Sequence, residues 1–302
     1  MVQQLAQIFF SVIAPVFGLV LIGFVAGPRL QLDARTLSRV AYFLFVPAYV
    51  FHVVSTAVLD VSLLTRMIAY TTAVHMAIAV AAYLMARGLR RPRVMVGAYI
   101  IIAVFGNVGN FGLPLIEFRL GPDAVLYATF YFLIIVVLAF IISVTAAGWA
   151  KGGGRGAALG VFKTPALLAL FPALLFNGLD ITPPLFLSRI VGLLAAAMVP
   201  TMLLTLGVQL AGASQIRFNR DVVLASGLRL IGAAALAYLL AGLFGLTGLV
   251  RAAGVLQASM PTAVLAAIIA LEHDLLPDFV TTAVLFTTLA SVITLPFIML
   301  II

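Results

Sequence analysis

The sequence contains no cysteine and few charged residues. Without a thiol, a disulfide framework, a cysteine nucleophile and a cysteine-ligated metal site are all excluded. Only 9% of the 302 residues are charged, whereas soluble domains carry about a quarter. The three histidines are far apart, and no His-Glu-x-x-His or Gly-x-Ser-x-Gly sequence occurs. The sequence therefore predicts no enzyme, no cofactor and no metal site.

Apolar residues make up 65% of the chain. A helix needs about 20 residues to cross a bilayer, so 302 residues can supply on the order of ten crossings. Because backbone facing lipid must satisfy its own hydrogen bonds, we expect an all-α polytopic membrane protein with ten transmembrane helices. The first apolar run lacks a basic n-region and is too long for a signal peptide, so we interpret it as a span. The predicted spans are 5–27, 36–56, 62–86, 94–118, 122–147, 160–178, 185–212, 222–244, 248–271 and 279–302.

The net charge of +8 does not indicate a nucleic-acid partner, because the basic residues are scattered over short loops. Four of the 17 basic residues, Arg66, Arg119, Arg189 and Arg251, belong to one side of the predicted bundle, and the other 13 belong to the opposite side. By the positive-inside rule, the richer side is cytoplasmic. We therefore expect a protein of the bacterial inner membrane with both termini extracytoplasmic.

A basic, glycine-rich stretch, "AKGGGRGAALG", divides the chain near its middle. It lacks the Gly-Lys-Ser/Thr ending of a phosphate-binding loop, and we interpret it as a flexible linker. The predicted units are a five-helix repeat at 1–149, a cytoplasmic linker at 150–159 and a second repeat at 160–302. An odd number of spans per half inverts the second repeat. Three matched pairs support the duplication: Leu37–Arg39 with Leu187–Arg189, Pro47 with Pro200, and Pro114 with Pro261.

The stretch "FGNVGNFGLPLIE" interrupts the fourth span with three glycines, two asparagines and a proline. The ninth span contains "QASMP", where Gln257 precedes Pro261 by the same four residues that separate Asn110 from Pro114. Proline deprives the carbonyl four residues back of its helical donor. We expect broken helices whose free polar groups line a site, since such backbone is tolerated at membrane depth only in protein or beside a wet cavity. A simple kink is the alternative. The predicted helix-break residues are Gly106, Gly109, Gly112, Pro114 and Pro261.

Three ionisable residues within spans have two interpretations each, because buried charge is costly and usually functional. Arg229 could neutralise an anionic substrate, or reach the headgroups or pair with Asp221. His75 could carry a coupling proton or be a neutral packing residue. Glu117 could be a counter-charge at the start of the second half-helix or a coupling residue.

The motifs "GNVGNFGLPL", "LQASMPTAVLA" and "LFVPAYVF" resemble those of the auxin efflux carrier family, in its bacterial branch. The resemblance covers nearly the whole chain. It implies two inverted repeats in which helices 4 and 9 break and cross, a mobile core of helices 3–5 and 8–10, and a dimeric scaffold of helices 1, 2, 6 and 7. It also implies elevator-like transport of organic anions such as auxin or malonate, often outward. The implied crossover residues are Asn107, Asn110, Pro114, Ser259, Pro261 and Thr262.

Two departures from the plant branch limit what the resemblance carries over. Its Asn-Pro-Asn crossover pattern is absent, so we do not expect auxin itself as the substrate. The only lysines, Lys151 and Lys163, lie in or beside the linker, so the plant coupling chemistry does not transfer.

Together these features predict a secondary transporter that exports small organic anions. Its expected partners are the anion, membrane lipid and a second copy of the chain. The alternatives are an importer coupled to H⁺ or Na⁺, an anion channel and a membrane-embedded enzyme. The predicted substrate-binding residues are Asn107, Asn110, Gln257, Ser259, Thr262 and Arg229.

Overall fold

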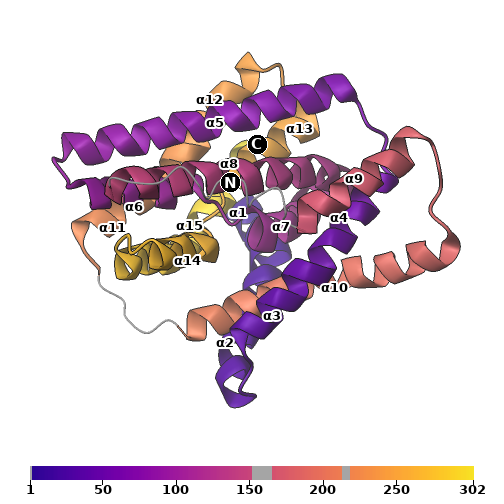
Figure 1. The fold of residues 1–302 in the computed structure, drawn as a ribbon, viewed down its shortest axis with the longest axis horizontal. Coiled ribbons are helices and arrows are strands. Elements are labelled where there is room, and N and C mark those ends of the chain that lie inside the picture. Colours follow the sequence, from indigo (N-terminus) through magenta and orange to yellow (C-terminus); the bar gives the residue numbers. More distant parts are fainter. Residues whose placement is uncertain (1, 152–164, 213–217) are drawn as a thin grey trace.

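The computed structural model describes residues 2–151, 165–212 and 218–302, and these residues are helical apart from their connections and one isolated β-bridge (Figure 1). Residues 152–159 of the predicted linker lie outside the described residues. The first half contains α1 (Val2–Ile8), η1 (Phe9–Ile13), α2 (Ala14–Arg29), α3 (Ala34–Val40), η2 (Ala41–Phe45), α4 (Val46–Ser55), α5 (Val61–Gly88), α6 (Arg93–Val104), η3 (Val108–Gly112), α7 (Leu113–Leu120) and α8 (Pro122–Lys151). The second half contains α9 (Pro165–Gly178), α10 (Leu185–Ala211), α11 (Arg220–Gly227), η5 (Leu228–Gly232), α12 (Ala233–Leu243), α13 (Gly248–Ala258), α14 (Val264–Glu272) and α15 (Pro277–Ile301).

Seven helices in the described part of the chain are long and apolar enough to cross a membrane. They are Gln3–Arg29, Ala34–Ser55, Val61–Gly88, Pro122–Lys151, Leu185–Ala211, Arg220–Leu243 and Pro277–Ile301. Each matches a predicted span. The predicted spans 94–118 and 248–271 are each divided into two shorter helices, and 160–178 contains the short helix α9. The chain is therefore an all-helical, polytopic membrane protein.

Three π-helical segments, written η, each lie just before a proline. η1, η2 and η3 precede Pro15, Pro47 and Pro114, which occupy the first turn of the helix that follows. The helix continues from each π-helical segment into the next α-helix, so each proline is inside a longer helix. A local π-helical adjustment is one way in which a membrane helix accommodates the missing N–H of a proline. A fourth segment, η5, carries Arg229. Such segments often mark functional positions.

Five helices form what we call the lateral group: α2, α3, α4, α9 and α10 (Figure 1). Within it α2 packs along α10 with the two backbones in contact, because glycines face the partner helix. A Cβ atom at Gly207 would collide with the carbonyl oxygen of Val20, and one at Gly23 with that of Leu204. Asn177 of α9 donates to the carbonyl oxygens of Val54 (3.0 Å) and Ala57 (2.6 Å), which ties α9 to the end of α4.

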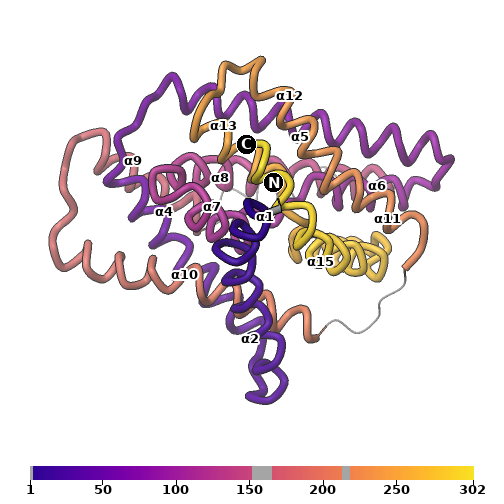
Figure 2. Tube along the Cα trace, turned by 180° about the vertical axis from the view of Figure 1, so that it is seen from behind, coloured from indigo at the N-terminus to yellow at the C-terminus, as the bar shows by residue number. Residues whose placement is uncertain are grey.

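The remaining long helices form the crossing group: α5 to α8 and α11 to α15. Here α6 packs on α5 and α8, α13 packs on α8 and α12, and α14 packs on α15. The N-terminal helix α1 contacts α15, and Figures 1 and 2 both show the two chain ends close together.

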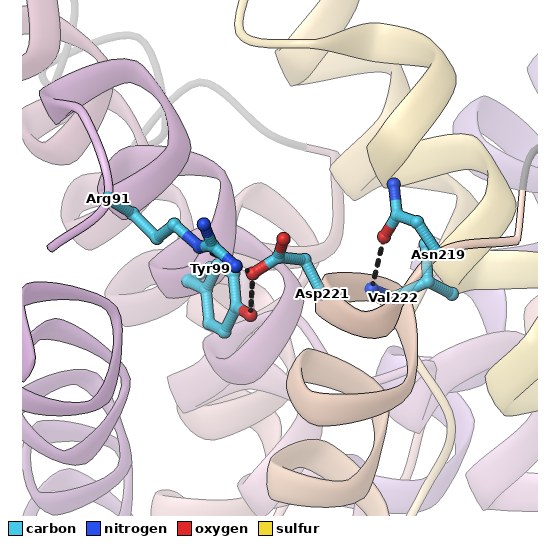
Figure 3. Close-up of polar contacts among 5 residues, drawn as sticks. All are labelled: Arg91, Tyr99, Asn219, Asp221 and Val222. Atoms are coloured by element: carbon cyan, nitrogen blue, oxygen red, sulfur yellow. Dashed lines mark hydrogen bonds and ion pairs between the residues drawn. The ribbon is translucent and has the colours of Figure 1, made fainter. Parts of the chain in front are cut away.

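Polar contacts at the start of α11 join it to α6 and to the loop before α6 (Figure 3). Asp221 accepts hydrogen bonds from Arg91 Nε (2.9 Å) and Tyr99 Oη (2.6 Å), and Asn219 caps the helix by accepting from the Val222 N–H (2.9 Å). Asp221 therefore pairs with Arg91, and its expected alternative pairing with Arg229 is wrong.

Candidate functional site

The two interruptions lie side by side and are joined backbone to backbone. After α6 the chain is irregular from Phe105 to Asn107, and after α13 it is irregular from Ser259 to Ala263. The Asn107 N–H donates to the Pro261 carbonyl (2.7 Å), and the Ala263 N–H donates to the Phe105 carbonyl (2.8 Å). These two bonds form an antiparallel bridge between Gly106 and Thr262. The predicted fourth and ninth spans are therefore each divided in two, and their irregular segments are hydrogen-bonded to each other.

The first break is not at Pro114, as the sequence suggested, but several residues earlier. Pro114 lies in α7, which continues η3 with helical dihedral angles, so this proline is inside the second half-helix and not at the break. The Asn107 carbonyl accepts from the N–H groups of Phe111 (3.3 Å) and Gly112 (3.0 Å), so this residue begins the second half-helix. The Gln257 carbonyl, which we expected to be free, accepts from the Met260 N–H (3.3 Å).

Arg229 lies at the centre of the crossing, and the expectation that it reaches the headgroups is wrong. Its side chain is fully buried, with 0% exposure. The guanidinium donates from Nε to the Met260 carbonyl (2.8 Å), from Nη1 to the Ala103 carbonyl (2.8 Å) and from Nη2 to the Ala258 carbonyl (3.0 Å). None of the carboxylates in the described residues forms an ion pair with it. The crossing thus contains a buried positive charge that no acidic side chain neutralises.

Two buried carboxamides flank the bridge, and each has one atom without a partner. Gln257 donates from Nε2 to the Ala128 carbonyl (3.1 Å), whereas its Oε1 accepts no hydrogen bond. Asn107 has an unpaired Nδ2. Buried polar atoms are normally paired, so an unpaired donor beside the first break and an unpaired acceptor beside the second are candidate contacts for a ligand or water. Asn110 is partly buried in η3, which packs against α10 of the lateral group.

The hydroxyl groups at the second break mainly support its backbone. Ser259 donates to the Val255 carbonyl (2.7 Å) and Thr262 to the Ile102 carbonyl (3.2 Å). The Thr262 N–H donates to Oγ1 of Thr287 on α15 (3.1 Å). Thr287 was not predicted from the sequence. Its signal is weak: buried hydroxyl residues cluster at 287–291 on an otherwise apolar helix.

Two glycines of the first break leave space for side chains of the other half, and a third leaves space for Phe132 of α8. A Cβ atom at Gly106 would collide with Nη2 of Arg229, and one at Gly112 would collide with Oε1 of Gln257. At Gly109 it would press on the Phe132 ring at 2.9 Å. These glycines therefore allow the site to assemble, in addition to weakening the helix.

The two coupling candidates lie in different environments. His75 is fully buried on α5, where Nδ1 is 2.9 Å from the Thr71 carbonyl and so carries the proton. Its Nε2 has no partner, and its ring packs edge-on against Tyr131, with centroids 5.7 Å apart. Glu117 is exposed and lies beyond the first turn of α7, which does not support a counter-charge at the start of that helix.

A cavity of about 280 Å³ opens where α1, α7 and α15 meet. Its polar lining is Gln4, Gln7, Ser11 and Arg119. Arg119 donates from Nη2 to the Met299 carbonyl (2.9 Å), and its Nε is buried without a partner. The cavity therefore offers a cationic group and two carboxamides.

A bundle of apolar helices around a buried polar crossing defines the class of membrane transport proteins. The chain matches the family model described as membrane transport protein over residues 8–150 and 155–299, and the short gap between the two segments lies in the glycine-rich stretch. The chain belongs to this family, that of the auxin efflux carriers, and the resemblance is confirmed. It is a family of transporters, not of enzymes.

Two relatives match the chain along most of its length. An "Uncharacterized transporter" of Methanothermobacter thermautotrophicus (strain ATCC 29096 / DSM 1053 / JCM 10044 / NBRC 100330 / Delta H) is 31% identical over 293 residues, covering 92% of this chain and 93% of that protein. A "Putative malonate transporter" of Rhizobium meliloti (strain 1021) is 28% identical over 298 residues, covering 94% of this chain and 92% of the relative.

Proposed function

We propose that the protein is a secondary transporter of small organic anions and that the anion binds at the crossing of α6/α7 with α13/α14. The observation that carries the proposal is the buried Arg229 charge, which lacks a carboxylate partner among the described residues, beside two buried carboxamides with unpaired atoms. A buried charge is costly when no opposite charge accompanies it, even where carbonyl oxygens bind its N–H groups. An arriving anion lowers that cost while it is bound, which gives the site its preference for negative charge.

Individual side chains have separate roles in this scheme. Arg229 attracts the anion through its charge, since three of its N–H groups already bind carbonyl oxygens. The Asn107 amide donates to a carboxylate oxygen, and the Gln257 oxygen accepts from a hydroxyl, a protonated carboxyl or a water on the cargo. Asn110, Ser259 and Thr262 complete the lining. Small dicarboxylates are the first substrates to test, because the relative from Rhizobium is named for malonate.

The packing of the helices supports an elevator-type movement. We assign the lateral group, with the N-terminal helix that leads into it, as the scaffold, which also carries the homodimer contact, and the crossing group as the mobile core. The divided segments α6/α7 and α13/α14 occupy corresponding places in the two halves, as two inverted five-helix repeats with ten crossings require. We propose that both termini lie outside the cytoplasm, in the bacterial inner membrane, and the charge bias supports this orientation.

The cavity beside Arg119 is then the extracytoplasmic mouth of the pathway. It lies where α1 meets the crossing-group helices α7 and α15, at the predicted basic-poor side of the bundle. Its guanidinium and carboxamides suit a carboxylate that enters or leaves.

Export is the leading direction, and a proton-coupled importer is the alternative. The buried Nε2 of His75, next to Tyr131, is the observation that favours the alternative, because a neutral imidazole nitrogen can accept a proton. Glu117 is the second coupling candidate.

Counterflow in proteoliposomes tests the proposal. A carrier loaded with unlabelled malonate accelerates uptake of labelled malonate, whereas a channel does not. Replacing Asn110→Leu should abolish counterflow, because it removes the amide at the boundary between the moving and fixed groups while leaving a partly buried side chain of similar size. Gln209→Leu is the matched control, since this carboxamide bonds to Ser38 within the lateral group, away from the crossing. Full counterflow by Asn110→Leu, or equal loss in both variants, would contradict the assigned site.

A further inference from the structure

Three backbone carbonyl oxygens converge on one side chain at the crossing. Ala103 lies in the last turn of α6, Ala258 ends α13, and Met260 lies in the second break. The C-terminal end of a helix carries partial negative charge. In transporters built from broken helices, such half-helix ends and unwound carbonyls are the groups that hold a coupling Na⁺.

In this protein the site is filled by a side chain of the chain itself. Arg229 donates to all three oxygens, at 2.8 Å to Ala103, 2.8 Å to Met260 and 3.0 Å to Ala258. The oxygens come from both halves of the chain, so the guanidinium connects the end of α6 with the end of α13. The side chain is fully buried, and the missing side chain of Gly106 provides the space for Nη2.

We infer that Arg229 is a built-in cation that occupies the carbonyl site between the two half-helix ends, so that neither folding of the crossing nor transport requires Na⁺ or another metal ion. The three oxygens are spaced for a planar fork with several donors. Lysine would supply the charge but not the fork. The statement that transport needs no Na⁺ rests on the proposed function. The statement that Arg229 fills the carbonyl site does not, because it can be tested without any transport.

The first test uses thermal unfolding of the purified, full-length protein and needs no substrate. Wild-type protein should have the same Tm in sodium, potassium and choline chloride. Arg229→Ala should lower the Tm by on the order of 5–10 °C, because three buried carbonyl oxygens lose their donors. Millimolar methylguanidinium should restore several degrees by entering the vacated site.

Arg91→Ala is the matched control for this rescue. This variant also loses a guanidinium, one that is paired with Asp221, but Arg91 is partly exposed in the loop before α6. Methylguanidinium should not raise its Tm, because no enclosed carbonyl site is created there.

A second measurement keeps the inference testable if Arg229→Ala does not fold. Malonate counterflow by wild-type protein should be equal, within twofold, in sodium and in choline. A wild-type Tm or flux that rises with Na⁺, or an Arg229→Ala protein that ignores methylguanidinium, would overturn the inference. If wild-type protein moves no malonate at all, only the proposed function fails, and the unfolding experiment still decides the cation site.

Discussion

At the residue scale, the glycines of the first break matter for the atoms they make room for. Gly106 faces the Arg229 guanidinium and Gly112 faces the Gln257 carboxamide. The sequence predicted that this glycine-rich segment interrupts a helix. It could not predict the facing side chains, because these lie in the other half of the chain and only the folded bundle brings them together.

Gly106→Ala should damage the crossing because its methyl group displaces Arg229. We expect a loss of about 1–3 kcal/mol of stability, the usual cost of overfilling a packed interior, and loss of malonate counterflow. Gly227→Ala is the control, since it lies two residues before Arg229 and a Cβ atom there meets nothing within 4 Å. Equal thermal unfolding of Gly106→Ala and Gly227→Ala would contradict this role.

The position of Arg229 shows the limit of prediction at single residues. Its depth in an apolar span indicated a functional charge, and it does lie at the crossing. Its partners are backbone carbonyls, which every residue has and which therefore leave no mark in a sequence. For the same reason the sequence pointed to Pro114 as the break, whereas the chain unwinds at Phe105–Asn107.

At the element scale, the crossing of α2 and α10 depends on small residues. Without a hydrophobic driving force in lipid, helices associate through close van der Waals packing, which glycines permit. Gly23 and Gly207 let the two backbones touch.

Gly207→Ala should therefore lower the stability of the protein by about 1–3 kcal/mol, because its Cβ atom has no space against the α2 backbone. Gly192→Ala, on the same helix, meets nothing within 4 Å. That control should gain up to about 1 kcal/mol from its better helix propensity. Thermal unfolding in detergent measures both. A Gly207→Ala protein as stable as Gly192→Ala would show that this crossing is loose.

The ends of the crossing-group helices provide a second comparison. Asp221→Asn should cost about 1–2 kcal/mol, since the charge holds both Arg91 and Tyr99 in a partly buried place. Asp274→Asn removes the partner of Lys151 but should change stability by less than about 0.5 kcal/mol, because Asp274 is 85% exposed. Chemical unfolding should separate the two variants; similar small effects would mean that the Asp221 contacts do not stabilise the fold.

The helices themselves were largely predictable from hydropathy and length. All seven long spans lie where the apolar runs do. The ends of the broken spans were not, because the bridge between Gly106 and Thr262 fixes them through contacts between distant segments.

At the scale of the whole molecule, the distribution of arginine and lysine predicts orientation. The cysteine-free sequence makes the test direct. A membrane-impermeant maleimide should label Gln3→Cys in intact spheroplasts and should label Arg90→Cys only after the membrane is opened. Both positions are exposed. The reverse pattern would place the termini in the cytoplasm and invert the pathway.

The bridge between the two breaks also determines which surfaces can slide. Two backbone hydrogen bonds connect Phe105 and Asn107 to Ala263 and Pro261. The helices next to them, α6, α7, α13 and α14, therefore cannot move independently of one another. In the movement that we propose, sliding therefore occurs at a boundary without such hydrogen bonds. Phe111 of η3 packs edge-on against Phe17 of α2, with ring centroids 5.4 Å apart. Two apolar rings can move past each other without breaking a hydrogen bond. In the proposed mechanism, the bound anion would thus move with the crossing group as one rigid body along this aromatic boundary.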